Sequence, residues 1–147
     1  MSTVRRFEVL PEHLGVSLPR RATPASAGYD LAAAETVLVP PGSVALVPTG
    51  LRAWMPADEF LAIHLRSSVA VGRGLMLANG TGIIDADYAG NARNGGHILI
   101  AVRNVGPATV RLEAGERLAQ GIFLRYQVTD GDEPGPERAG GFGSTGV

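Results

Sequence analysis

Two carboxylates and a tyrosine follow a short apolar run in Gly82–Tyr88, whose sequence is GIIDADY. A carboxylate at the end of a strand is held rigidly and can take a proton from a water molecule within hydrogen-bond reach, so this stretch offers a candidate general base. The alternative is an Asp-rich hairpin turn whose side chains only accept bonds from backbone N–H groups. Taken alone, the stretch leaves both interpretations open.

A guanidinium stands beside two hydroxyls at Arg66, Ser67 and Ser68. This combination suits an oxyanion such as phosphate, because arginine presents two parallel donors and the hydroxyls add further ones. The alternative is a serine that caps a short helix next to a surface arginine. Both interpretations can hold together, since helix N-termini also bind anions.

Two further polar residues and the end of the chain are weaker candidates. Asp30 follows Gly28 and Tyr29 at the start of a strand-like segment, and Gln120 has the character of a polar group satisfied within a sheet. Residues 129–147 are rich in Gly, Pro and charge and have one aromatic residue, Phe142. Such a segment is typical of a disordered tail, but glycines around a ring, followed by Ser144 and Thr145, could also form a lid over a planar, phosphorylated ligand.

Short apolar segments separated by Gly, Pro, Asn and Asp must position these residues. One helical turn or short helix is predicted at Ser68–Gly72, and the many short strands predict an all-β barrel or jelly roll. The predicted strands are Arg6–Leu10, Tyr29–Ala33, Thr36–Val39, Ser43–Val47, Leu51–Met55, Phe60–Leu65, Leu75–Leu77, Thr81–Ile84, His97–Arg103, Ala108–Leu112 and Arg117–Arg125.

The composition excludes several classes of protein. A chain of 147 residues, 45% of them hydrophobic, is one domain with a core of its own, and 20 Gly with 10 Pro disfavour a helix bundle. All 13 basic residues are arginine and the net charge is −1, which excludes a Schiff-base lysine and argues against stable nucleic-acid binding. Cysteine is absent, and neither a membrane-spanning run nor a signal-peptide core is visible. We therefore expect a cytoplasmic protein with no membrane association.

The order of five segments is more informative than any one of them. In sequence order, the chain contains AGYDL at Ala27–Leu31, RSSVA at Arg66–Ala70, NGTGIIDADYAG at Asn79–Gly90, RLAQ at Arg117–Gln120 and GGFGSTG at Gly140–Gly146. In these five motifs the chain resembles the trimeric dUTPase family. The resemblance implies a distorted jelly-roll β-barrel over residues 1–128 and a flexible, glycine-rich C-terminal arm over 129–147. It also implies a homotrimer with shared active sites, each of which includes the C-terminal arm of a neighbouring subunit.

The same resemblance implies an activity: hydrolysis of dUTP to dUMP and pyrophosphate with Mg²⁺, which limits uracil in DNA and supplies dUMP for dTMP synthesis. Asp85 matches the carboxylate that activates the attacking water, and Asp30 the residue that acts on the metal through water. Tyr88 matches the ring that packs on the deoxyribose. The residues that match substrate-binding positions are Arg66, Ser67, Ser68, Asn79, Ile83, Ile84, Tyr88, Gln120, Arg138, Phe142, Gly143, Ser144 and Thr145.

Four departures from the family pattern stand out. Leu65 and Ser68 replace the more frequent Pro and Gly, Arg138 lies four rather than five residues before Phe142, and an insertion, Asn91–Gly96, follows Tyr88. Two other functions remain open. A deaminase of the same superfamily would act on dCTP, and a non-catalytic trimer would bind nucleotide or a protein partner as a regulator, with the insertion as the place to look for such a role.

Overall fold

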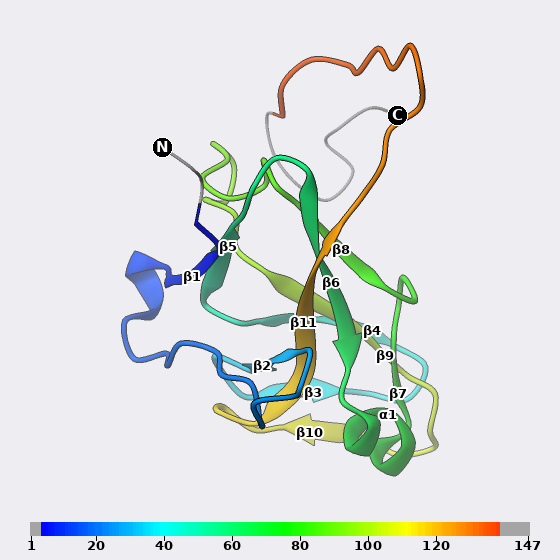
Figure 1. Ribbon diagram of the computed structural model, residues 1–147. Helices are drawn as coiled ribbons and strands as arrows, with labels where there is room; N and C mark the ends of the chain where they lie inside the picture. The colour runs from blue at the N-terminus through cyan, green and yellow to red at the C-terminus, as the bar shows by residue number, and fades with distance from the viewer. Residues whose placement is uncertain (1–3, 139–147) are drawn as a thin grey trace.

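The computed structural model describes residues 4–138, which form a β-rich molecule with one short helix (Figure 1). The elements are β1 (Arg6–Val9), the 3₁₀ turn η1 (Pro11–His13), β2 (Tyr29–Ala32), β3 (Val37–Val39), β4 (Val44–Pro48), β5 (Leu51–Trp54), β6 (Glu59–Leu65), α1 (Ser67–Arg73), β7 (Leu75–Leu77), β8 (Gly82–Asp85), β9 (Leu99–Asn104), β10 (Val110–Leu112) and β11 (Arg117–Arg125). The predicted all-β, jelly-roll class is confirmed.

The strands form four small antiparallel sheets, in the orders β1-β5, β10-β3, β2-β11-β6-β8 and β4-β9-β7. In the four-stranded sheet the long strands β11 and β6 lie side by side, and β2 and β8 form its edges (Figure 1). Because residues distant in sequence pair here, this sheet brings four of the five predicted motifs onto one framework.

Alternation along the strands builds the core. In β9 the even-numbered residues Ile100, Val102 and Asn104 are buried, while the residues between them are more exposed. Leucine and valine side chains from the other strands complete one apolar cluster. The buried Asn104 amide donates to Val39 O at 2.8 Å and Ala108 O at 2.7 Å, so its polar atoms are satisfied inside the core.

The predicted and observed strands agree in number and order, with small differences at their ends. The strand predicted from His97 begins at Leu99, because His97 and Ile98 belong to the loop that crosses to β5, where the Ile98 N–H donates to Leu51 O at 2.8 Å. The helix spans Ser67–Arg73 rather than Ser68–Gly72 and ends at Gly74, whose φ of 66° is left-handed.

Beyond β11 the chain continues to Arg138 without helix or strand, and its residues are mostly exposed. The predicted boundary at residue 128 falls in this stretch and stays a prediction. Phe142, Gly143, Ser144 and Thr145 lie outside the described residues. Within the described part of the chain, no helix has the length and apolar character that crossing a membrane requires.

Candidate active site

The GIIDADY stretch forms strand β8 and the turn that follows it. β8 pairs with β6 so that Gly82 lies opposite Ile63 and Asp85 opposite Phe60. Gly82 is needed at this crossing, because a Cβ atom there would lie 2.9 Å from the Ile63 Cβ. The Tyr88 N–H donates to Asp85 O at 3.1 Å and closes the turn. Asp85 is therefore the last residue of a paired strand, as the general-base interpretation requires.

A pocket of about 180 Å³ lies against this strand. A cavity of roughly 150 Å³ can hold benzene, so the pocket has room for one six-membered ring. It brings together six residues predicted from the sequence as site residues, and the apolar side chains of β6, β7 and β9 complete the wall. The six are Asn79, Ile83, Ile84, Asp85, Tyr88 and Arg138.

Arg138 joins the two carboxylates of the turn. Its Nη2 lies 2.5 Å from Asp85 Oδ2 and its Nε lies 2.8 Å from Asp87 Oδ1. These bonds raise the pKa of the Arg138 guanidinium above its ordinary value, and the bond to Asp87 contributes most. The guanidinium also lies 5.8 Å from the centre of the Tyr88 ring. Both carboxylates stay more than half exposed, so water reaches them.

A second cluster lies at the other end of the same sheet. Asp30 of β2 accepts a 3.2 Å ion pair from Arg117 Nη1 and lies 3.7 Å from Arg66 Nε. Arg66 Nη1 also donates to Arg117 O at 3.1 Å. In β11, Gln120 lies opposite both Asp30 and His64 of the flanking strands. The sheet register thus gathers three separate motifs into one cationic cluster with a single carboxylate.

Arg117 is a member of this cluster that sequence reasoning did not assign. It is the first residue of the RLAQ motif, in which only Gln120 was predicted as a site residue. Its signal is weak in the sequence, since a charged residue at a strand start is ordinary. The contact with Asp30 comes from strand pairing across 87 residues.

The two serines after Arg66 open helix α1 and are exposed. The alternative interpretation, in which one of these serines caps the helix N-terminus, is wrong. Arg66 is the N-cap, in extended conformation, and no side chain caps the helix. Because neither hydroxyl satisfies the helix end, both remain available as donors beside the Arg66 guanidinium.

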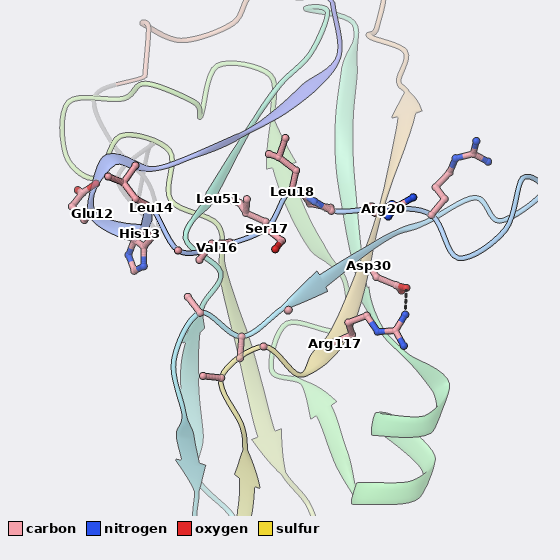
Figure 2. A pocket seen from close by; sticks show the side chains of 18 of the residues that line it. Glu12, His13, Leu14, Val16, Ser17, Leu18, Arg20, Asp30, Leu51 and Arg117 are labelled. Atoms are coloured by element: carbon pink, nitrogen blue, oxygen red, sulfur yellow. Dashed lines mark hydrogen bonds and ion pairs between the residues drawn. The ribbon is translucent and has the colours of Figure 1, made fainter.

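A larger pocket of about 940 Å³ adjoins the second cluster (Figure 2). Its wall runs along the Glu12–Ala22 segment and then along β2, with Asp30 and Arg117 at one side, as the dashed contact in Figure 2 shows. Arg20 and Arg21 add positive charge. This volume lies within the usual range for small-molecule sites.

One chain holds the two clusters far apart. Asp85 lies opposite Phe60, whereas Arg66 follows the end of the same strand, β6, six residues further on. At about 3.3 Å per residue, that distance is roughly 20 Å. The carboxylate turn and the arginine cluster therefore cannot act on the same phosphorus within one copy of the chain.

Within residues 4–138, no group of three or more His, Cys, Asp or Glu side chains could hold a metal ion. Asp30, with its two arginines, is the carboxylate of the second cluster. An ion that is chelated by substrate phosphates and keeps several waters needs no more than such a single carboxylate. The residues present therefore fit Mg²⁺ that arrives with a triphosphate.

Comparison with known proteins gives one consistent result. The protein-family model named dUTPase matches residues 15–146. The chain is 48% identical to the deoxyuridine 5'-triphosphate nucleotidohydrolase of Lactococcus lactis, over 98% of this chain and 99% of that protein. It is 41% identical to that of Desulfitobacterium hafniense, over 88% and 87% of the two chains.

Solved structures agree with these matches. The dUTPase from Streptococcus mutans superimposes with a TM-score of 0.80 at 41% identity, covering 85% of this chain and 98% of that one. A dUTPase of Staphylococcus bacteriophage 80alpha with dUpNHpp shares the fold, with a TM-score of 0.75 at 23% identity and coverage of 98% and 99%. The five motifs, the β-rich fold and these matches together place the chain in the dUTPase family.

Proposed function

We propose that the protein hydrolyses dUTP to dUMP and pyrophosphate, and that it does so in sites shared between copies of the chain. The observation that carries the proposal is the pocket beside β8, which combines room for one ring with an exposed carboxylate at its edge. The names of the Lactococcus and Streptococcus relatives support dUTP as the substrate. The products follow from the resemblance of the five motifs to the family.

The β8 pocket would take the uracil ring and the sugar. Asn79 and the backbone around Ile83 and Ile84 would read the edge of the base, and the Tyr88 ring would pack on the deoxyribose. Asp85 would take a proton from a water molecule, whose oxygen attacks the α-phosphorus. The bond to the bridging oxygen then breaks and pyrophosphate leaves. Developing charge on the leaving group needs nearby cations.

The second cluster would supply those cations. The phosphate oxygens would be contacted by Arg66, by Gln120 and by the exposed hydroxyls of Ser67 and Ser68. Arg117, which lies in the same cluster, would contact them too. Mg²⁺, when bound, would neutralise phosphate charge, and Asp30 would contact it through water. A related phage phi11 dUTPase has a coordinated structural Mg(II) ion. Phosphate groups would compete with Asp85 and Asp87 for Arg138.

A homotrimer would unite the two clusters, because each chain alone separates them by roughly 20 Å along β6. The C-terminal residues Phe142, Gly143, Ser144 and Thr145 would cover the uracil and the phosphates in this assembly. Their proposed roles depend on the family resemblance alone. We also infer a cytoplasmic location, where limiting uracil in DNA and supplying dUMP for dTMP synthesis would take place.

The test is to incubate the protein with each deoxynucleoside triphosphate and Mg²⁺ and to measure pyrophosphate. We expect turnover of dUTP alone. Asp85→Asn should lower kcat by roughly 10²–10⁴-fold, the usual contribution of a general base, with little change in nucleotide binding. Asp87→Asn is the matched control, because Asp87 is also more than half exposed and binds the same Arg138; its effect should be smaller.

The result would count against the proposal if Asp85→Asn turned over dUTP at the parent rate. Release of ammonia from dCTP in the same assay would instead identify the deaminase alternative. Nucleotide binding without any product would identify the non-catalytic one.

A further inference from the structure

The hydroxyl group of Tyr88 belongs to a buried side chain and forms two hydrogen bonds. Tyr88 is only 6% exposed, and its Oη donates to His97 O at 2.7 Å. The same Oη accepts a 2.9 Å bond from Asn94 Nδ2. Both partners lie in the segment that follows the turn. The insertion Asn91–Gly96 and the adjacent His97 therefore hold Tyr88, which lines the β8 pocket.

The insertion is itself a closed, internally bonded loop. Asn91 is 9% exposed, and its Nδ2 donates to Tyr88 O and to Asn94 Oδ1, both at 2.8 Å. Asn94 Oδ1 also accepts the Gly96 N–H at 3.1 Å. Gly96 has a φ of 92°, and a Cβ there would lie 2.5 Å from Ala89 Cα, so the two ends of the loop touch. The Asn94 amide is therefore fixed before it reaches Tyr88.

The loop is also attached to strand β5 and the turn before it. The Gly50 N–H donates to His97 Nε2 at 2.9 Å, and Arg52 Nη1 reaches Gly95 O at 3.4 Å. Gly90 lies against the Trp54 ring, where a Cβ would be 3.0 Å from a ring carbon. Through these contacts the groups that bind the Tyr88 hydroxyl are fixed to the β-framework, so the hydroxyl is not held by a free loop.

We propose that Asn94 is a positioning residue for sugar selection, acting through the hydroxyl of Tyr88. The inference rests on the proposed function, in which the Tyr88 ring excludes a 2′-hydroxyl. A wall rejects one extra hydroxyl only if it does not move aside, and packing alone lets a ring shift about its side-chain torsions. Two hydrogen bonds at the far end of the ring oppose that shift. In this view the insertion serves specificity, not an external partner.

The experiment measures kcat/KM for dUTP and for UTP in the full-length protein and in five variants. They are Tyr88→Ala, Tyr88→Phe, Asn94→Ala, the double variant Tyr88→Phe/Asn94→Ala and Arg93→Ala. Arg93 is the matched control, because its exposed side chain lies on the same loop and forms no hydrogen bond or ion pair with the described residues. The thermal midpoint of each variant is measured at one protein concentration.

We expect the preference for dUTP over UTP to fall by roughly 10–100-fold in Tyr88→Ala, the range by which a pocket rejects one small group. It should fall by roughly two- to tenfold in both Tyr88→Phe and Asn94→Ala, the usual contribution of one hydrogen bond. The double variant should fall no further than Tyr88→Phe alone, because Asn94 has no hydroxyl left to act through. Arg93→Ala should keep the parent preference.

The outcomes separate the two proposals. Parent-like preference in Tyr88→Ala would overturn the sugar-selecting role of Tyr88 itself. If Tyr88→Ala lost the preference for dUTP while Tyr88→Phe and Asn94→Ala kept it, the sugar-selecting role of Tyr88 would stand. The positioning role of Asn94 would be overturned, since the bulk of the ring would then suffice. Additive losses in the double variant would also overturn it, because Asn94 would act by another route. Tyr88→Phe leaves every hydrogen bond within the loop in place, so the test survives if Asn94→Ala folds poorly.

Discussion

Gly28 and Gln120 illustrate how closely single residues are fitted in the proposed phosphate site. A Cβ atom on Gly28 would lie 2.4 Å from Gln120 Oε1 and 2.8 Å from Gln120 Cβ. Contacts of that length do not occur in proteins, so one of the two residues would have to move. The glycine of the first motif thus makes room for the glutamine of the fourth, and this relation is invisible in either motif alone.

Gly28→Ala should therefore displace Gln120 and lower kcat/KM for dUTP by roughly 10–100-fold, because misplacement of about 1 Å can cost that much in a positioned site. The comparison is steady-state kinetics of Gly28→Ala against Gly15→Ala, where a Cβ would meet no atom within 4 Å. Equal losses in both variants, or none in Gly28→Ala, would show that Gln120 does not contribute through its position.

At the scale of elements, the loop that carries Tyr88 depends on a neutral histidine. The ring of His97 accepts the Gly50 N–H through Nε2, and it lies 5.0 Å from the ring of His13. Burial first, and then the neighbouring His13, lower the pKa of His97 below its ordinary 6.5, while Glu12 and Glu35 oppose this weakly. A protonated Nε2 could not accept the Gly50 bond.

The sign of the pH effect follows from this lowered pKa. Below pH 6.5 the unfolded chain binds a proton at His97 before the folded chain does, so stability from this group is complete above pH 6.5 and is lost as the pH falls toward the folded value. Denaturant unfolding at fixed protein concentration, between pH 7.5 and 5, checks the prediction. His97→Gln should show a shallower decline than the parent, because it cannot titrate. Identical declines would contradict it.

For the whole molecule, the decisive feature is the separation of the two clusters along β6. Asp85 and Arg66 lie roughly 20 Å apart in one chain, yet the proposed reaction needs both at one triphosphate. A closed ring of identical chains resolves this conflict, since each interface can join the turn of one copy to the arginine cluster of the next. Light scattering should give three times the 15.3 kDa chain mass.

Mixing two inactive variants tests the shared site directly. Asp85→Asn and Arg66→Ala should each have little activity as pure proteins. When the two are unfolded and refolded together in equal amounts, about a quarter of the sites should combine an intact Asp85 from one chain with an intact Arg66 from another. Activity should therefore reappear in the mixture. No recovery in mixed trimers would mean that both residues serve a site within the same chain.

Local sequence signals predict the strands, their order and the chemistry of the candidate residues. Strand periodicity and the Gly, Pro and Asn breaks between strands are local signals, which is why eleven expected strands correspond to β1–β11 with shifts of only one or two residues. Asp85 at a strand end is equally local. Resemblance across five motifs added the family, which no single segment could have given.

Which of these residues come into contact depends on the tertiary fold. Asp30 contacts Arg117 across 87 residues, and Tyr88 acquires its anchors only when the insertion folds back toward β5. The sequence marked the insertion as an oddity and left Arg117 unassigned. Sheet register and loop closure are properties of paired strands, and no local pattern encodes a partner's position. The same non-local pairing placed the carboxylate turn and the arginine cluster at opposite ends of β6, which is why we propose that a complete site is formed by more than one chain.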